Sequence, residues 1–258
     1  MKRITGLLVF AAFLVTPFLA FAAESKGGVG LYVAPRFIYG STGMKSMEIE
    51  GNNFNDVSGM KKSSAPYGGA LAIGYDLGRQ TRIPLRLEVE GAIYSQVKGE
   101  EPWDGSKYIW IYDPDTVNFG YKQKLNIKTA FVNLYYDFRN ETPFSFWIGG
   151  GAGMAYIDSK ASYSIYFPPG NTTFGGSPYE ERWSASKKKN SNFAWNIGAG
   201  VGYDITNAIT VDIGYRFSRL GGVKSNECVG LLTIPQTHQM KTGSITMHQL
   251  LLGLRLTF

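Results

Sequence analysis

The sequence predicts an all-β protein, an eight-stranded antiparallel up-and-down β-barrel that crosses a membrane with its strands. Three observations predict it. Eight segments alternate apolar and polar side chains over about ten residues each, as transmembrane strands do. The connections between these segments alternate strictly between short and long. The last segment places leucine at every second position before a terminal aromatic residue.

The N-terminus precedes these strands and predicts a secretory signal peptide at residues 1–22. Lys2 and Arg3 stand before an apolar run at residues 4–15, and Ala20 and Ala22 form a small-residue cleavage site. An uncleaved anchor helix is the alternative, although the apolar run is short for one. The mature chain would then be residues 23–258. Removing Lys2 and Arg3 from 26 basic residues leaves 24 against 20 acidic residues, a balance too mild to indicate a nucleic-acid partner.

The strands follow one another along residues 23–258, each with one apolar and one polar face. In the first, Leu31, Val33, Phe37 and Tyr39 alternate with residues of the other face. Such period-two patterning is the signature of a strand that lies between two different environments. The predicted strands cover residues 31–39, 70–77, 85–94, 125–138, 144–157, 193–205, 209–218 and 245–258.

The connections predict which end of the barrel faces which compartment. Three are short, at residues 78–84, 139–143 and 206–208, and four are long and polar, at residues 40–66, 97–124, 158–192 and 219–244. In an up-and-down sheet every second connection emerges on the same side, so the long ones lie together. Short periplasmic turns and long extracellular loops are the layout of outer-membrane barrels. A soluble β-sandwich would alternate too, with its polar face toward water.

The last strand argues against the sandwich and carries a resemblance. Its leucines alternate up to the terminal Phe258, a row that would invite aggregation on a soluble edge strand but suits hydrocarbon. Together with the signal peptide, the repeated Gly-Tyr-Asp strand ends and the Gly-rich stretch IGGGAGMAYI, this row resembles the small eight-stranded outer-membrane barrels of the opacity-protein and OmpA type. The resemblance covers nearly the whole mature chain. It implies a location among outer-membrane lipid and lipopolysaccharide, and recognition of Phe258 by the barrel-assembly machinery. The residues of the row are Leu250, Leu252, Leu254, Leu256 and Phe258.

Four related stretches, AIGYDL, LYYDF, VGYDI and IGYRF, predict aromatic girdles at the two lipid–water boundaries. Tyr75, Tyr136 and Tyr203 end strands that descend to short turns, where the ring can contact acyl chains while the hydroxyl reaches water. Tyr215 and Phe217 end a strand that rises to a long loop, so we expect them in the outer girdle. Buried core tyrosines are the alternative interpretation.

Charged residues at inward positions predict a lumen filled by ion pairs. An eight-stranded barrel leaves room only for side chains, and charges of both signs in that space should pair. Glycines at every second position of residues 149–153 and 198–202 are expected to leave room for long arginine side chains. A narrow channel that opens by rearranging these pairs is the alternative. The charged positions are Arg36, Arg86, Glu88, Glu90, Asp212, Arg216 and Arg255.

The sequence gives little sign of catalysis, and no cofactor or metal is expected. His238 and His248 are the two histidines, and neither stands in a local arrangement with serine or in a GxSxG elbow. The stretch with Asp113 and Asp115 lacks the glycine and terminal glutamate of a calcium loop. Cys228 is the single cysteine and cannot form an intramolecular disulfide. A lipid A-modifying barrel enzyme remains the catalytic alternative.

Two long connections combine aromatic residues with lysines, a composition that suits contact with a host or cell-surface ligand or with lipopolysaccharide. We therefore expect a non-enzymatic surface protein whose extracellular loops serve adhesion, surface interaction or envelope integrity. The alternative for residues 108–112 is a strand pair that continues above the membrane. The candidate contact residues are Trp103, Tyr108, Trp110, Tyr112, Trp183, Lys187, Lys188 and Lys189.

Overall fold

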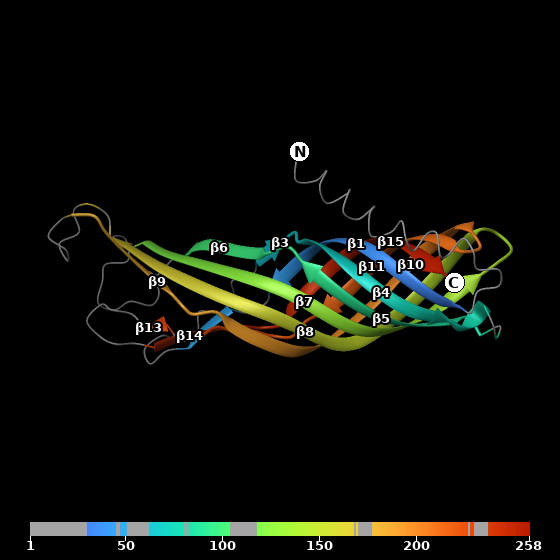
Figure 1. Ribbon diagram of the computed structural model, residues 1–258. Coiled ribbons are helices and arrows are strands. Elements are labelled where there is room, and N and C mark those ends of the chain that lie inside the picture. Colours follow the sequence, from blue (N-terminus) through green and yellow to red (C-terminus); the bar gives the residue numbers. More distant parts are fainter. Residues whose placement is uncertain are drawn as a thin grey trace.

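Figure 1 shows the computed structural model of the protein. It describes residues 30–44, 47–50, 62–79, 81, 83–103, 118–167, 169, 177–226, 228–229 and 237–258, so the predicted signal peptide lies outside the described part. Nearly all of this part is strand, with one short 3-10 helix, η1 (Leu77–Arg79), after β4. None of the described helices has the length and apolar character needed to cross a membrane.

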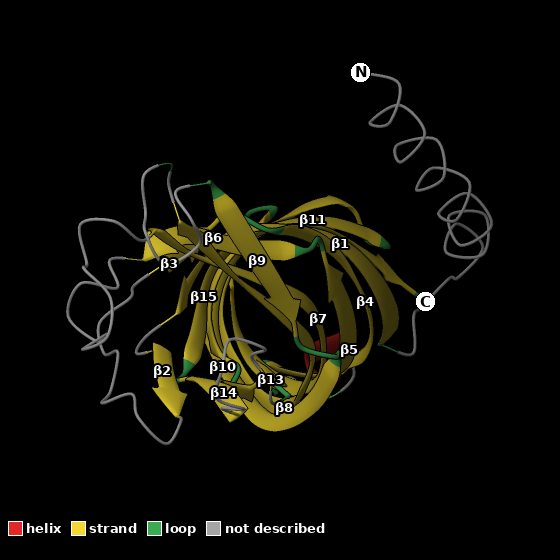
Figure 2. Ribbon diagram, turned by 90° about the vertical axis from the view of Figure 1, so that its left-hand side faces the viewer, coloured by secondary structure: helices red, strands yellow, loops and turns green. Residues whose placement is uncertain are grey.

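Eight strands form a closed antiparallel barrel, which Figure 2 shows close to end-on. Each pairs with the next along the chain, and the last returns to the first through register partners that include Arg36–Gly253. The predicted fold class is therefore confirmed. The eight strands are β1 (Leu31–Met44), β4 (Tyr67–Asp76), β5 (Leu85–Tyr94), β7 (Asn118–Arg139), β8 (Phe144–Phe167), β10 (Lys188–Thr206), β11 (Ile209–Arg219) and β15 (Ile245–Thr257).

Much of what the sequence predicts as loop is strand, and those loop boundaries are wrong. Strands β7 and β8 stay paired from Arg139–Ser145 to Asn118–Tyr166, far into the two connections predicted at residues 97–124 and 158–192. The backbone ladder continues because its hydrogen bonds do not depend on which solvent surrounds the side chains. Seven short strands add to this extension: β2 (Met47–Glu50), β3 (Lys62–Ser64), β6 (Val97–Trp103), β9 (Tyr179–Ser184), β12 (Val223–Lys224), β13 (Cys228–Val229) and β14 (Thr237–Thr242).

The wall formed by β7 and β8 is taller than a membrane requires. A transmembrane strand needs about 9–11 residues, whereas β8 has 24. At about 3.3 Å per residue and a tilt of about 45°, β8 rises about 55 Å, roughly twice the height of the apolar band of such barrels. The surplus lies at the left end of Figure 1, with β6 and β9, away from the C-terminus.

Exposed apolar side chains form a band around the outside of the barrel. On β7 they are Val132, Leu134, Tyr136 and Phe138, each at least 43 % exposed. On β15 Leu250 and Leu252 are exposed and Leu254 is half-buried. Leu256 has the same phase but is only 1 % exposed, so, contrary to the expectation, it does not add to the exposed apolar surface.

The inside and the outside of the barrel exchange character above this band. On β7 the inward residues Asn133 and Asp137 are polar, but further up the inward residues Leu125 and Ile127 are apolar. The outward residues change in the opposite sense, from Leu134 to exposed lysines at positions 122, 124 and 128. The lower section is therefore built for a lipid surround, whereas the upper section resembles a water-soluble barrel with its own core.

Candidate functional site

The middle of the lumen holds a continuous chain of ion pairs. Arg36 donates from Nη1 and Nη2 to Oε1 and Oε2 of Glu88 at 2.6 and 2.5 Å, and from Nη1 to Glu90 at 2.6 Å. Arg216 donates from Nη1 to the other oxygen of Glu90, also at 2.6 Å. Both carboxylates are fully buried. Bidentate, charge-assisted bonds of this kind hold buried ions in one arrangement.

A second group of charges lies nearer the short turns, and it contains residues that the sequence interpretation missed. Arg86 pairs through Nε with Asp137 at 2.7 Å, and Arg139 bridges Asp137 and Asp76 at 2.9 and 2.5 Å. Asp76 and Asp137 each follow a tyrosine in the repeated strand ends, and both are buried. Their arginine partners could not be assigned from one strand's pattern.

Arg255 and Asp212, both predicted for the lumen, also lie together there. Nε of Arg255 is 3.4 Å from Oδ2 of Asp212, and Nη2 donates to Oδ1 at 3.4 Å. Both side chains are buried. The structure thus brings all seven predicted charges into the lumen, in separate groups rather than in one network.

Neutral polar side chains add hydrogen bonds to the buried charged groups. The hydroxyl groups of Tyr32 and Tyr135 donate to Glu88 at 3.0 and 3.3 Å, and Gln249 accepts from Nε of Arg216 at 2.8 Å. The guanidinium of Arg86 lies over the ring of Tyr135, 4.9 Å from its centroid. The sequence interpretation missed these three neutral residues, because an inward tyrosine or glutamine has no charge to mark it.

The lumen glycines accommodate rings more than arginines, and the expectation for them is wrong in this respect. A Cβ at Gly149 would overlap the ring of Tyr135, and one at Gly200 would overlap the indole of Trp147. These two rings contact each other edge to face, with centroids 5.4 Å apart. The glycines therefore make room for an aromatic filling between the arginines.

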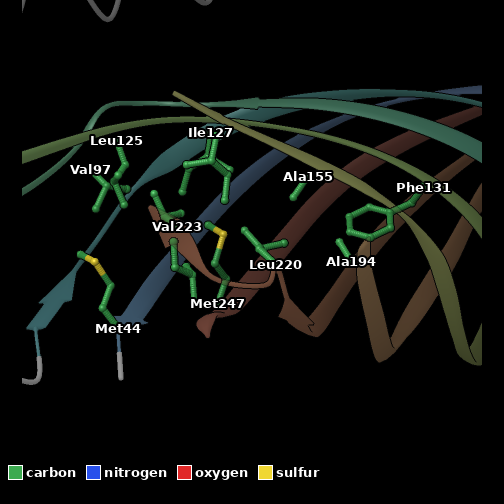
Figure 3. Close-up of a cluster of buried hydrophobic side chains, with 12 residues drawn as sticks. Met44, Val97, Leu125, Ile127, Phe131, Ala155, Ala194, Leu220, Val223 and Met247 are labelled. Atoms are coloured by element: carbon green, nitrogen blue, oxygen red, sulfur yellow. The ribbon is translucent and has the colours of Figure 1, made fainter. Parts of the chain in front are cut away.

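An apolar cluster fills the lumen of the upper section, as Figure 3 shows. Its members are buried and come from β1, β6, β7, β8, β10, β12 and β15, with Leu220 from the segment after β11. With the ion pairs below, this cluster occupies an interior that eight strands leave only wide enough for side chains. The cluster consists of Met44, Val97, Leu125, Ile127, Phe131, Ala155, Ile157, Ala194, Leu220, Val223, Ile245 and Met247.

The residues predicted for the girdles lie on the outer surface. Tyr136 and Tyr203 are each 43 % exposed and contact the rings of Phe138 and Phe144, at 4.7 and 4.9 Å between centroids. Tyr75 is half-buried. Near the other boundary, Tyr215 is exposed and Phe217 is half-buried.

His248 lies on this outer surface as well, which separates it from any site in the lumen. Its Nδ1 lies 2.5 Å from the hydroxyl oxygen of Tyr215, and its ring packs against Phe217. His238 and Cys228 are opposite each other in the backbone register of β13 and β14. No group of three or more His, Cys, Asp or Glu residues suited to a metal occurs among the residues that the structure describes.

The predicted loop contacts are placed in part. Trp103 and Trp183 belong to β6 and β9, in backbone register with Phe119 and Tyr163. Lys187 pairs with Asp158 at 2.6 Å, Lys188 donates to the carbonyl oxygen of Ser225 at 3.4 Å, and Lys189 is exposed. Tyr108, Trp110 and Tyr112 lie outside the described residues, so the alternative of a continuing strand pair there stays a prediction.

Comparison with known proteins agrees with this architecture. A family model described as "Outer membrane protein beta-barrel domain" matches residues 7–258. PagN of Salmonella typhimurium is 30% identical over 223 residues, which cover 83% of this chain and 84% of that protein. Opacity protein opA67 of Neisseria gonorrhoeae is 24% identical over 190 residues, 67% of this chain and 74% of that protein. A Rickettsia conorii protein, provisionally named adhesin RC1281, is 22% identical over 188 residues, 73% of this chain and 66% of that protein.

These matches confirm the resemblance to small outer-membrane barrels and the predicted location. The long-loop end is then the extracellular end, and the exposed apolar band faces membrane lipid. The chain belongs to the outer membrane protein β-barrel domain family and is a surface protein of the bacterial outer membrane.

Proposed function

We propose that the protein is a non-enzymatic, non-conducting adhesin. In this proposal the membrane section is a filled anchor, and the extracellular section carries the contact surface for a ligand on a host or other cell. The observation that carries the proposal is the upper section itself, a paired wall that continues far above the lipid band around its own apolar core. A rigid platform of this kind reduces the entropy lost when its tips bind a partner.

Two further observations support the non-conducting and non-enzymatic parts. The lumen holds buried ion pairs below and an apolar cluster above, so an ion would have to displace both. His248 points outward, onto the aromatic residues Tyr215 and Phe217, whereas hydrolytic or acyl-transfer catalysis needs convergent partners. The provisional name of the Rickettsia relative is consistent with adhesion.

The adhesion proposal can be tested by shortening one side of the upper wall. Ala185 donates its backbone N–H to the carbonyl of Ala161 at 2.9 Å, so these residues face each other across β8 and the segment before β10. Replacing residues 162–184 with an Asn-Gly turn would close this hairpin at a natural pair. Bacteria that display the shortened protein should bind cultured epithelial cells no better than bacteria without it.

The control is surface display of folded protein at the wild-type level, measured by protease accessibility and by the faster gel migration of unheated barrel. Undiminished cell binding by the shortened protein would remove the adhesion proposal. Separate assays address the other two parts. Discrete conductance steps of the purified barrel in planar bilayers would contradict a closed lumen, and a changed lipopolysaccharide mass spectrum on expression would contradict the absence of enzyme activity.

A further inference from the structure

Three exposed lysines stand side by side on neighbouring strands of the tall wall. Lys98 of β6 is the register partner of Lys124 of β7, and Lys124 is the register partner of Lys160 of β8. All three side chains point outward and are exposed. Lys187 comes directly before Lys188, whose partner is Ser159, so it continues the row beside Lys160.

The row lies just above the lipid band, and a further lysine marks the band's edge. Lys128 is exposed and has Ile93 and Tyr156 as register partners, which are 64% and 49% exposed. Lys124 follows four residues further up β7, about 9 Å higher at 3.3 Å per residue and a tilt of about 45°. With Lys189 of β10, these residues form what we name the lysine patch: Lys98, Lys124, Lys128, Lys160, Lys187 and Lys189.

The positive charge of the patch is largely uncompensated. Within the part of the chain that the structure describes, one patch lysine forms an ion pair, Lys187 with Asp158. Like charges directly opposite each other on adjacent strands destabilise a sheet, so Lys98, Lys124 and Lys160 repel one another in the absence of a bound anion. An anion that sits between them would remove this repulsion and gain from each ammonium group.

Three other strands of the described barrel wall, β1, β4 and β15, have no charged residue on their outer face. Strands β1, β4 and β15 contain Arg36, Asp76 and Arg255 as their formally charged residues, and all three point into the lumen. The outer surface of those strands is apolar or neutral up to their extracellular ends. Compared with these three strands, the outer face of β6, β7, β8 and the start of β10 is strongly basic.

We propose that the lysine patch binds the phosphate groups of lipopolysaccharide in the surrounding outer leaflet. These phosphates sit at the headgroup level, directly above the hydrocarbon, where Lys128 and the row of Lys98, Lys124 and Lys160 lie. Flexible lysine stems can rest on the apolar band while their ammonium groups reach such phosphates. A sulfated polysaccharide on another cell would have to enter the headgroup layer to reach Lys128. The partner proposed here lies in the protein's own membrane, so the inference goes beyond adhesion and does not depend on it.

The test compares two double variants of the refolded, detergent-solubilised protein. Lys124→Gln/Lys160→Gln removes two patch charges, and Lys224→Gln/Arg182→Gln removes two charges from exposed positions outside the patch. Titration with fluorescent lipopolysaccharide should give at least tenfold weaker binding for the patch variant, and binding within twofold of wild type for the control. Lys124→Arg/Lys160→Arg should retain binding, and dephosphorylated lipopolysaccharide should bind wild type as weakly as the patch variant binds the native form.

Several results would overturn the proposal. They are absence of binding by wild type, equal affinity of wild type and patch variant, and undiminished binding of dephosphorylated lipopolysaccharide. Loss of heparin binding with unchanged lipopolysaccharide binding would assign the patch to a sulfated polysaccharide instead. If the double variant does not fold, as judged by gel migration before and after boiling, the single variants Lys124→Gln and Lys160→Gln test the same point. The affinity of wild type should also fall steadily with added salt.

Discussion

Arg36 on β1 binds Glu88 on β5 across an intervening strand, with Nη1 donating to Oε1 and Nη2 donating to Oε2. The strand between them is β4, whose inward residues at this level are Ala70, Ala72 and Gly74. Because these side chains are small, the arginine can extend over β4 and reach the carboxylate. The ion pair therefore ties three neighbouring strands together from inside the barrel.

Replacing Glu88 with leucine should destabilise the barrel by about 3–5 kcal/mol, because a buried arginine loses its main partner. Arg36→Leu in the same chain should recover most of this loss, since it removes the guanidinium group that has lost Glu88, while Glu90 keeps Arg216 as a partner. The measurement is urea unfolding in liposomes. Arg255→Leu is the matched comparison, because Arg255 pairs with Asp212 and should add its own loss instead. Equal effects of the two second substitutions would show that Glu88 has no specific partner.

Leu87→Arg, one residue away, should cost about 2–4 kcal/mol for a different reason. Leu87 is 49 % exposed within the apolar band, so the new charge would lie in hydrocarbon. Asn126→Arg provides the control, because Asn126 is exposed above the band, where water is present, and should change stability by less than about 0.5 kcal/mol. The same urea experiment applies. If the two substitutions changed the free energy of unfolding equally, the position assigned to the lipid band would be wrong.

Gly200→Leu should destabilise the barrel by about 1–3 kcal/mol or prevent its folding. A side chain there would overlap Trp147 and the carbonyl oxygen of Ile213, a backbone atom that cannot move aside cheaply. Gly91→Leu is the same substitution with nothing within 4 Å of the new Cβ, and it should be neutral or stabilising. Folded yield and urea midpoint distinguish the two. Similar values for both variants would contradict a packed lumen.

Deleting Phe258 should reduce assembly into the outer membrane, if the terminal aromatic residue is the recognition signal that the family resemblance implies. The backbone N–H of Phe258 donates to the carbonyl of Leu31 at 2.8 Å, at the seam where β15 meets β1. Phe258→Tyr keeps both this bond and an aromatic ring and should assemble normally. The measurement is the amount of heat-modifiable protein in outer-membrane fractions, compared between the deletion and Phe258→Tyr. A truncated chain that assembles like wild type would leave Phe258 without this role.

The membrane section could be predicted from the sequence because lipid outside and polar groups inside impose strict alternation. The extent of the strands could not, because the alternation changes sign within a strand. On β7 the exposed apolar residues from Val132 to Phe138 stand at even positions, whereas the buried apolar residues Leu125 and Ile127 stand at odd positions. On β15 Leu250 and Leu252 face outward, whereas Ile245 and Met247 face inward. This change of phase is visible in the sequence and marks where the lipid ends.

The charged residues of the lumen could be predicted from the sequence, but their ion-pair partners could not. Inward phase alone places Arg86 and Glu88 in the lumen, yet they are not partners, since Arg86 binds Asp137 on β7. Partners depend on strand register and on which inward residues are small enough to reach across. The lysine row escaped detection for the same reason, because Lys98, Lys124 and Lys160 are far apart in sequence and become neighbours only through pairing.

The change of phase has a consequence for the route by which the protein enters its membrane. The upper wall, with its six patch lysines, has to pass from the periplasmic side to the outside. At about 2–4 kcal/mol for each lysine at the midplane, moving them through intact hydrocarbon would require on the order of 12–24 kcal/mol. If the strands crossed one at a time, their lysine-bearing upper ends would enter the hydrocarbon first. The free energy gained by placing the lipid-facing leucines in hydrocarbon would come only later. We therefore expect insertion to proceed where the bilayer is thinned or opened, with the extracellular section passing through as a partly formed hairpin array.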